Sequence, residues 1–351
     1  MKRLIAIIAA SLIATSSYAH NMVYLDADSI TSSTVLIRAA EVHNEIGVGS
    51  YFDLGSGSNL DIDIDLQGNS SGCCNRIVGG FNSNSYSSLK IKMDGSATGN
   101  RVELDYDYTG LSTYHHLDID IDGGSNSIYY DDGDVDHSNS SVEIDIEGGS
   151  NTIYATIAGT QQATKINIDG SSNLVSAWTS GTGDLATSRT AIWDSNDAST
   201  YALWISITGS SNTIRAKSVD TSKTKITMSG NGNHTISEYG DSDDWLLNQD
   251  GGIIDLTLGG AGNNRIGYSG SGSGNTATIT VNGNCNGCCQ VDLQQTGGSN
   301  RFELEVTGST DYNYRPLFTQ DGSDSYCATV ALGDLTGHNQ TTTTNASGGC
   351  S

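Results

Sequence analysis

Apolar and polar residues alternate along much of this chain, in short runs that end at glycine. In residues 142–155, VEIDIEGGSNTIYA, Ile144 and Ile146 alternate with Asp145 and Glu147. A period of two places successive side chains on opposite faces of a β-strand. The pattern therefore predicts strands with one buried and one solvated face, whereas no stretch of useful length has the period of an α-helix.

The alternating run belongs to a phrase that recurs along the chain, with the form apolar-x-apolar-x-Gly-x-x-Asn-x-apolar. Clear copies are KINIDGSSNLVSA at 165–177 and WISITGSSNTIRA at 204–216, and looser copies lie between residues 89 and 306. The corner residues of the phrase are Gly123, Asn126, Gly148, Asn151, Gly170, Asn173, Gly209, Asn212, Gly230, Asn233, Gly260, Asn263 and Asn300. The asparagines are separated by 25, 22, 39, 21, 30 and 37 residues, which indicates a unit of about 22 to 25 residues with some longer insertions.

Each unit reads as a strand, a turn and a second strand. Gly148 and Gly149 permit backbone angles that are closed to other residues, so the chain can reverse before Ile153 begins the next strand. One unit cannot bury its own apolar face, but stacked units can, with neighbouring backbones about 4.8 Å apart. Asparagines stacked in register would form a ladder of side-chain amides. We therefore expect an all-β fold, a β-solenoid of stacked strand–turn–strand repeats.

The N-terminal sequence and the extent of the repeats predict four regions. Residues 1–19 have a basic start, an apolar run too short to span a bilayer and small residues before a plausible cleavage point, as in a secretory signal peptide. Residues 20–58 form an N-terminal segment that can include the first layers, residues 59–308 the repeats, and residues 309–351 a C-terminal cap and tail. The expected product is secreted, extracellular or held at the cell surface, and has no membrane-spanning segment.

The chain is strongly acidic. Its net charge is −24, and loss of Lys2 and Arg3 with the signal peptide leaves 14 basic residues against 40 acidic ones, or −26. This charge opposes binding to nucleic acid and to anionic lipid. Pro316 is the single proline, so almost every main-chain N–H is free for sheet pairing.

The repeat resembles that of the curlins, the subunits of curli, which are secreted amyloid fibres of bacterial surfaces and biofilms. The curlin repeat runs Gln-x-Gly-x-x-Asn-x-Ala. Its Gly and Asn positions are matched here by Gly123 and Asn126, Gly148 and Asn151, Gly170 and Asn173, and Gly209 and Asn212. Its final Ala position holds Ile128, Ile153, Val175 and Ile214. Its first Gln position holds Ile121, Ile146, Ile168, Ile207, Met228 and Leu258, so an aliphatic seam is expected in place of a glutamine ladder.

The resemblance covers most of residues 60–308 and implies a structural protein. Such a protein would be a fibre subunit, or pilus-like surface-matrix protein, with a role in adhesion and biofilm. Its main partner would be another copy of itself, with secretion or nucleation partners besides. Assembly would use main-chain templating, in which a terminal layer offers unpaired N–H and C=O groups to the next subunit. No enzymatic activity, catalytic residue, cofactor or metal site is expected.

Two other functions remain open from the sequence. One is a polysaccharide-degrading enzyme on a right-handed parallel β-helix, whose coils have a similar length. The other is a monomeric solenoid that binds a partner through an aromatic patch in its longest insertion, formed by Trp178, Trp193, Tyr201 and Trp204.

The aspartates are the most obvious candidate site. They form rows at the outward strand positions, Asp61, Asp63 and Asp65 in one run and Asp118, Asp120 and Asp122 in another. A solvated face that keeps the sheet soluble explains them best, ahead of loose cation binding and of catalysis, which needs two carboxylates with different pKa values. The run DDGDVD at 131–136 is expected to be a turn rather than a calcium loop.

Seven cysteines are candidates for disulfide bonds in an exported protein. They are Cys73, Cys74, Cys285, Cys288, Cys289, Cys327 and Cys350. Local pairing is favoured, with Cys285 joined to Cys288 or Cys289 and Cys327 joined to Cys350. Bonds between the SGCCN and NGCCQ corners of neighbouring subunits, and a Cys-x-x-Cys metal site, remain as alternatives.

Overall fold

The computed structural model describes the strands of the chain and part of their connections. The described residues are 5–9, 21–23, 31–40, 44–47, 52–54, 58–67, 75–81, 88–94, 99–105, 116–138, 141–160, 163–179, 202–219, 223–230, 233–236, 247–250, 252–260, 264–271, 274–282, 289–295, 300–307, 312–319, 325–331 and 341–343. All regular elements in these ranges are β-strands, which confirms the predicted all-β fold. None of these ranges forms a helix that could cross a membrane.

Two units divide the chain, the first made of residues 1–169 and 184–200 and the second of residues 170–183 and 201–351. Each unit contains strands of two sheets, sheet A and sheet B. Sheet A of the first unit has the order β1 (Ile5–Ala9), β3 (Thr31–Ala40), β6 (Ser58–Gln67), β8 (Ser88–Asp94), β10 (His116–Asp122), β12 (Ser141–Glu147) and β14 (Ala163–Asp169). Sheet B has the order β2 (Asn21–Val23), β4 (Asn44–Ile46), β7 (Arg76–Phe81), β9 (Arg101–Asp105), β11 (Ser127–Ser138) and β13 (Thr152–Thr160), with β5 (Phe52–Leu54) also beside β7.

The second unit repeats this arrangement. Its sheet A has the order β16 (Leu203–Thr208), β18 (Lys223–Ser229), β21 (Ile253–Gly259), β23 (Thr276–Asn282), β25 (Arg301–Thr307) and β27 (Ser325–Ala331). Its sheet B has the order β15 (Leu174–Thr179), β17 (Thr213–Val219), β19 (Thr235–Ile236), β22 (Arg265–Ser271), β24 (Cys289–Gln295), β26 (Tyr312–Thr319) and β28 (Thr341–Thr343), with β20 (Leu247–Asp250) pairing both β17 and β22.

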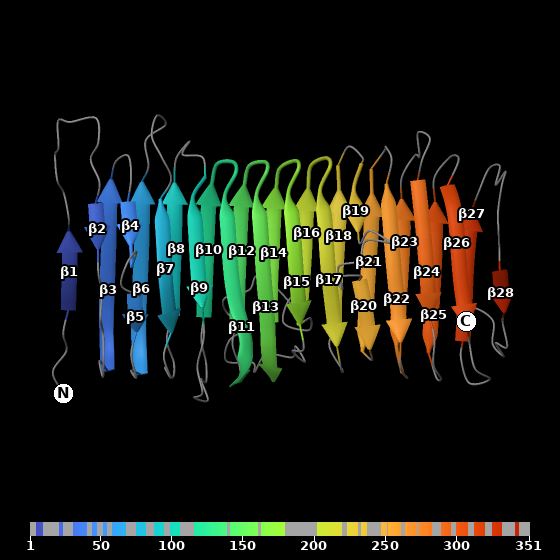
Figure 1. Ribbon diagram of the computed structural model, residues 1–351, viewed down its shortest axis with the longest axis horizontal. Coiled ribbons are helices and arrows are strands. Elements are labelled where there is room, and N and C mark those ends of the chain that lie inside the picture. Colours follow the sequence, from blue (N-terminus) through green and yellow to red (C-terminus); the bar gives the residue numbers. More distant parts are fainter. Residues whose placement is uncertain are drawn as a thin grey trace. The chain divides into compact units, whose positions relative to one another are not determined.

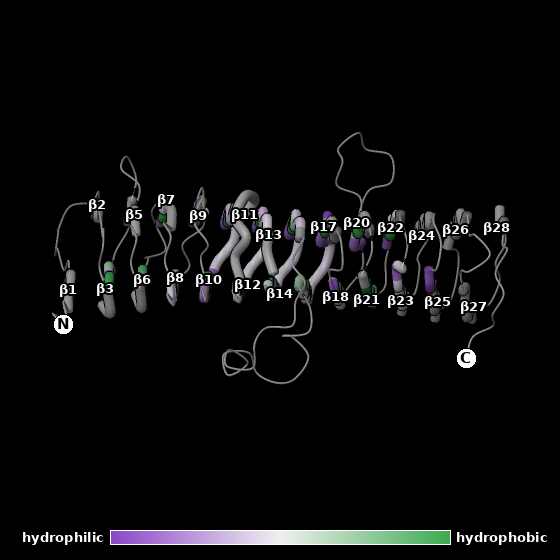
Figure 2. The backbone as a smooth tube through the Cα atoms, turned by 90° about the horizontal axis from the view of Figure 1, so that it is seen from below, coloured by the Kyte–Doolittle hydropathy of each residue, from purple (hydrophilic) through white to green (hydrophobic). Residues whose placement is uncertain are grey.

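Each layer of the solenoid consists of one course of sheet A and the following course of sheet B. Strands within a sheet are parallel and in register, so that Ile119 of β10 lies beside Ile144 of β12 and Ile144 beside Ile166 of β14. Within each unit, the arrows of sheet A point one way in Figure 1 and those of sheet B point the other way. Figure 2 shows the strands of each unit end-on as two facing rows. The layer is therefore built from two strand courses, and the predicted β-solenoid is confirmed.

The core lies between the two sheets and follows the alternation in the sequence. In β10, Leu117, Ile119 and Ile121 are buried, whereas the intervening aspartates face outward. Sheet B supplies the opposite wall through residues such as Ile128 and Ile153, both fully buried. Because every layer places aliphatic side chains at equivalent positions, each layer covers the apolar faces of its neighbours, as stacked repeats require.

The two connections within a layer differ in length. The path from sheet A to sheet B turns at the predicted glycine corner and is short around residues 123–126 and 148–151. The return from sheet B to sheet A ranges from two residues at 139–140 to 23 at 180–202. The irregular spacing of the repeats in the sequence therefore comes mainly from the returns.

Two short strands share one course of sheet B in two places. Beside β7, β4 pairs with Arg76 and Ile77 and β5 pairs with Gly79, Gly80 and Phe81. Beside β22, β19 pairs with the first two residues of that strand and β20 with the last four. A course of sheet B can therefore be assembled from two separate pieces.

Other segments differ from, or extend, what the sequence suggested. Residues 131–136, expected to form a turn, instead continue strand β11, whose pairing with β13 shifts register between Asp132 and His137. The N-terminal strands β3 and β4 continue the sheets through β6 and β7. The described strands of residues 309–351, β26 to β28, likewise continue both sheets.

Candidate functional site

The glycine corner is a tight reversal in which two residues adopt left-handed backbone angles. In the corner from 123 to 126, Gly123 has φ of 108° and Ser125 has φ of 59°. The next corner repeats this with Gly148 at 136° and Ser150 at 63°. Glycine adopts such angles without the penalty that a Cβ atom brings. A small polar residue at the second position accepts a modest penalty because the corner is held by its neighbours.

Neighbouring corners lie against each other through their backbones. A Cβ atom on Gly148 would come within 2.1 Å of the carbonyl oxygen of Gly123, and one on Gly209 within 1.9 Å of the carbonyl oxygen of Gly170. Main-chain hydrogen bonds continue from layer to layer through the corner, as from Gly123 N–H to the Glu147 carbonyl at 2.8 Å. Glycine is thus needed both for its backbone angles and for this close approach.

The asparagine that ends each corner has its side chain buried and bonded in two directions. The side-chain N–H of Asn126 donates to the carbonyl of Gly123 at 2.8 Å, and that of Asn151 donates to the carbonyl of Gly148 at 2.9 Å. The side-chain oxygen of Asn151 accepts the main-chain N–H of Asn126 at 2.9 Å. One amide therefore closes its own corner and joins it to the preceding layer.

This asparagine ladder runs through the first unit. Asn126 accepts the main-chain N–H of Asn100 at 3.0 Å, Asn100 accepts that of Asn75 at 3.0 Å, and the side chains of Asn75 and Asn44 are bonded at 2.8 Å. These four asparagines and Asn151 are each 1% exposed. Buried polar groups bonded in series stabilise the register, because a one-residue slip would break every bond.

Asn44, Asn75 and Asn100 also belong to the ladder, although the repeat did not predict them. Asn44 and Asn100 have no glycine three residues earlier, whereas Asn75 has one, Gly72, in the SGCCN run that was considered only for its cysteines. A second signal was present at Asn100, because Gly99 precedes it and has φ of 83°. A return from sheet B to sheet A uses the same device, because Gly274, with φ of 79°, precedes the buried Asn275 directly before β23. A residue tolerant of the left-handed region, directly before Asn-x-apolar, is therefore a signature of a turn into either sheet.

The second unit contains the same ladder in segments. Asn212 accepts both the main-chain N–H of Asn173 at 2.9 Å and its side-chain N–H at 3.0 Å. Asn300 accepts the main-chain N–H of Asn275 at 2.9 Å, but these two residues directly precede β25 and β23 of sheet A, so their bond lies where the chain returns from sheet B to sheet A. The predicted corner residues Asn173 and Asn212 therefore belong to the ladder, with Gly170 and Gly209 at the turns before them, whereas the predicted Asn300 does not.

Two corners are one residue longer than the repeat suggests. After Gly230, Asn233 is exposed with φ of 60°, and the buried ladder position is taken by His234. His234 N–H donates to the side-chain oxygen of Asn264 at 3.0 Å. The side-chain N–H of Asn264 in turn donates to the carbonyl of Gly260 at 3.1 Å. The ladder thus passes one residue beyond the predicted Asn233 and Asn263, and Asn263 itself lies outside the described residues.

His234 is a titratable side chain at a ladder position. It is 0% exposed, and neither of its ring nitrogens has a hydrogen-bond partner. Burial lowers the pKa of its imidazole, because the charged form would lose its hydration. This layer therefore replaces a bonded amide by a neutral ring.

The predicted aliphatic seam lies directly before the corners. Ile121, Ile146 and Ile168 are buried in the first unit, and Ile207, Met228 and Leu258 in the second. After the corner, Ile128, Ile153, Val175 and Ile214 are each 0% exposed. Each corner is therefore enclosed between apolar residues of the two sheets, which shields its hydrogen bonds from water.

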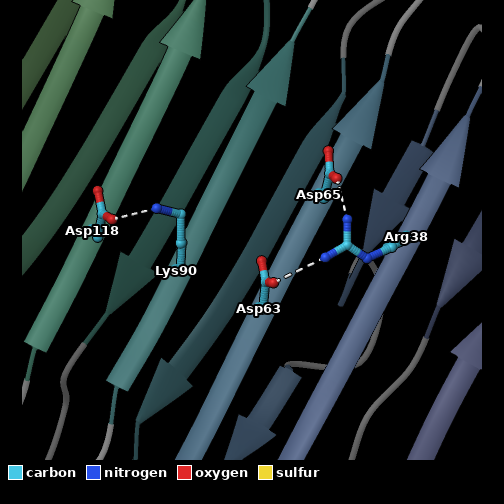
Figure 3. Close-up of polar contacts among 5 residues, drawn as sticks. All are labelled: Arg38, Asp63, Asp65, Lys90 and Asp118. Carbon is cyan, nitrogen blue, oxygen red and sulfur yellow. Dashed lines mark hydrogen bonds and ion pairs between the residues drawn. The ribbon is translucent and has the colours of Figure 1, made fainter.

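The carboxylates occupy the outer face of sheet A, as the alternation predicted. In the first unit Arg38 contacts Asp65 at 2.6 Å and Asp63 at 3.2 Å, and Lys90 contacts Asp118 at 2.9 Å (Figure 3). The partners of these pairs lie on neighbouring strands. Because the basic side chains are 51–58% exposed, each pair contributes about 0–1 kcal/mol at most.

Two aspartates on this face have perturbed acidity. Asp120 and Asp145 are register partners on β10 and β12. Partial burial raises the pKa of Asp120, assisted by its neighbours Asp122 and Asp118. Partial burial and the charge of Glu143 raise the pKa of Asp145, against the opposing effects of Lys165 and Asn167. Partial burial, together with like charges along the same strand, thus opposes full ionisation of the face.

Within the described ranges, no three His, Cys, Asp or Glu side chains are arranged to hold a metal ion. The predicted aromatic patch is described only in part. Trp204 is half-buried, and the Lys225 Nζ atom lies 4.9 Å from the centre of its ring. Trp178 is half-buried on β15, and Trp193 and Tyr201 lie outside the described residues.

Two of the seven cysteines lie in described strands, Cys289 in β24 and Cys327 in β27. The others lie outside the described residues, namely Cys73, Cys74, Cys285, Cys288 and Cys350. The proposed disulfide pairings therefore stay predictions.

Comparison of the chain with models of protein families, with curated proteins and with solved structures gives no match.

Proposed function

We propose that this chain is a secreted structural protein that assembles with other copies of itself into extracellular fibres or matrix. The supporting observation is the in-register stack of parallel layers, in which main-chain bonds continue even through the corners. A stack of this kind ends in strands that have a partner on one side only. The outer N–H and C=O groups of such strands form a template for a further strand.

The buried ladder supports the same proposal. Each asparagine side chain bonds to the layer before it, so a terminal corner offers a side-chain acceptor or an N–H donor to a new layer. A second copy, which carries the same corners, has the complementary groups at the same spacing. Identical stacked amides are the geometry of fibrous β-assemblies. The repeat that resembles the curlin repeat fits this role, although its glutamine positions are aliphatic here.

The acidic face sets the conditions for assembly. At −24 for the full chain, the copies repel one another at low ionic strength. Added salt shortens the distance over which the charges act, and mild acid neutralises the carboxylates whose pKa is raised. Assembly should therefore be faster at high salt and at mildly acidic pH.

The test is seeded growth of the exported chain, followed by thioflavin fluorescence and by sedimentation. Growth should accelerate with salt and yield parallel β-structure with a layer spacing of about 4.8 Å in fibre diffraction. A chain that stays monomeric at high concentration, in high salt and in mild acid would contradict the proposal and favour a monomeric binding module.

A further inference from the structure

The N-terminal end of sheet A is closed by a strand that belongs to the predicted signal peptide. Strand β1 pairs with β3 in parallel, from Ile5 opposite Thr34 to Ala9 opposite Arg38. Cleavage after Ala19 would remove β1 and leave β2, which begins at Asn21. In the mature chain, sheet B would begin with β2 and sheet A with β3, which follows β2 in the sequence. The outer edge of β3, where β1 pairs in the full chain, would then have no strand beside it.

Strand register shows which residues of the C-terminal strand β27 would lie opposite β3 if β27 of another copy paired with that edge. Ile121 and Ile207 each lie five residues before a ladder asparagine, so they are equivalent positions in the two units. Through strand register, Ile121 corresponds to Ala39 of β3 and Ile207 to Val330 of β27. In this register, residues 325–331 would lie opposite residues 34–40. The five residues of β3 that β1 covers all fall within that range.

Sheet B shows a matching division between the two ends. If the ladder residue is position 0, β2 covers positions 0 to 2, because Asn21 pairs with Asn44. At the other end, Asn264 is the ladder residue, and the residue after it, Arg265, pairs with Gln290. Cys289, directly before Gln290, is therefore at position 0, and so is its register partner Tyr312. Strand β28 pairs with Leu317 to Thr319, and so covers positions 5 to 7. The two short strands therefore occupy different halves of a course and do not overlap.

The molecule already contains courses divided in this way. Strand β4 covers positions 0 to 2 and β5 positions 4 to 6 of one course, counted from Asn75 through the partners of each strand. Strand β19 covers positions 1 and 2 and β20 positions 4 to 7 of another, counted from Asn212. A course made of β2 from one copy and β28 from another would have the same form.

We propose that the N-terminal and C-terminal ends of two copies join by forming one shared layer, and that residues 5–9 block this joint until they are removed. In the shared layer, β27 of one copy takes the place of β1 beside β3 of the next, while β28 and β2 complete the course of sheet B. This inference rests on the proposed self-assembly and specifies its interface and its regulation. The contact is head-to-tail, so it repeats without closing and gives a filament.

The decisive experiment uses two chains that are each blocked at one end. The full chain made without export keeps residues 1–19, so its N-terminal end is blocked, whereas none of the described strands pairs with the outer edge of β27. The exported chain with Ala328→Pro and Thr329→Pro has a blocked C-terminal end, because one of two successive N–H groups on a strand points to the outer edge. Each chain alone should show loss of seeded growth. A mixture of the two should give dimers of one copy of each and nothing longer, by analytical ultracentrifugation.

Matched controls separate blocking from misfolding. Ala6→Pro with Ile7→Pro in the full chain should detach β1 and restore growth, whereas Ser16→Pro with Ser17→Pro, outside β1, should not. In the exported chain, Asn345→Pro with Ala346→Pro, beyond β28, should leave growth intact. Circular dichroism and thermal unfolding of each variant would show whether the remaining layers are folded.

The outcomes distinguish this joint from the proposed function itself. Growth of the full chain at the rate of the exported chain would overturn the shared layer and leave self-assembly standing. Failure of the two blocked chains to form dimers, while the exported chain grows, would do the same. If the exported chain does not grow in high salt or mild acid, both proposals are overturned.

Discussion

The side-chain oxygen of Asn151 accepts the main-chain N–H of Asn126 from the preceding layer at 2.9 Å. Both residues are 1% exposed, so water cannot replace either partner of this bond. The same side-chain amide also donates to the carbonyl of Gly148 in its own corner, so it links two layers. The stability of one corner therefore depends on a side chain in the next.

Replacement of Asn151 by alanine should lower the free energy of unfolding by about 2–4 kcal/mol, because the buried N–H of Asn126 and the partly buried carbonyl of Gly148 lose this partner, at about 1–3 kcal/mol each. Urea unfolding followed by circular dichroism measures this change. The control is Thr208→Ala, at the exposed end of β16, which should change stability by less than about 0.5 kcal/mol. Equal effects of the two substitutions would show that the ladder does not carry the stability assigned to it.

Gly148→Ala should be among the most destabilising single substitutions, by about 3 kcal/mol or more, because the new Cβ meets the Gly123 carbonyl at 2.1 Å as well as an unfavourable φ. Gly274 has φ of 79° but open space around the position of a Cβ atom. Gly274→Ala therefore reports the backbone penalty alone, about 1–2 kcal/mol. Thermal unfolding of both variants separates steric contact from backbone conformation, and a larger loss for Gly274→Ala would contradict the close stacking of the corners.

His234 should make stability depend on pH between neutral and mildly acidic conditions. Its pKa is lowered in the folded chain, so the unfolded chain binds a proton first as the pH falls. Stability is thus greatest above the ordinary histidine pKa of 6.5 and decreases as the pH falls through that value toward the lowered one. His234→Asn should remove this dependence and supply an amide to the ladder. Melting temperatures from pH 8 to pH 5 provide the measurement, and an unchanged pH profile in the variant would count against a buried neutral ring.

Asp145 should act in the opposite sense. Its folded-state pKa is raised above the ordinary value of 3.8, so the folded chain binds the proton more tightly than the unfolded chain. This carboxylate therefore lowers stability at neutral pH, and the loss is recovered as the pH falls through the raised pKa. Asp145→Asn should stabilise the chain at pH 7 and flatten this part of the profile. Glu147→Gln, at the exposed end of the same strand, is the control, and a similar gain from that variant would point to net charge rather than to the burial of Asp145.

The alternation of Ile144 and Ile146 with acids was sufficient to predict strands, their buried faces and the stacking of layers. Local side-chain period determines these features, so no knowledge of distant contacts is needed. The aliphatic residues before and after each corner were located correctly for the same reason. The corner glycines and several ladder asparagines were also visible as a repeated motif.

The misplaced features depend on contacts between layers. Asn233 and His234 exchange roles because their corner has one extra residue, and only the register with the next layer decides which residue turns inward. Asn44 and Asn100 lie in corners without the repeated glycine spacing, whereas Asn75 has that spacing through Gly72 and was missed. The run at 131–136 has turn-like composition, but Asp131 and Asp132 pair with β13 before the register shifts, so tertiary context extends the strand into the run.

The two connections of each layer differ in length, so one of them, the return from sheet B to sheet A, can accept inserted residues. Extra residues at a glycine corner would separate carbonyls and amides that meet across adjacent layers, whereas the returns already vary from two residues at 139–140 to 23 at 180–202. A foreign peptide grafted between Ser138 and Ser141 should therefore be displayed at one edge without disturbing its neighbours. Copies of such a chain, joined in register, would present that peptide at regular intervals.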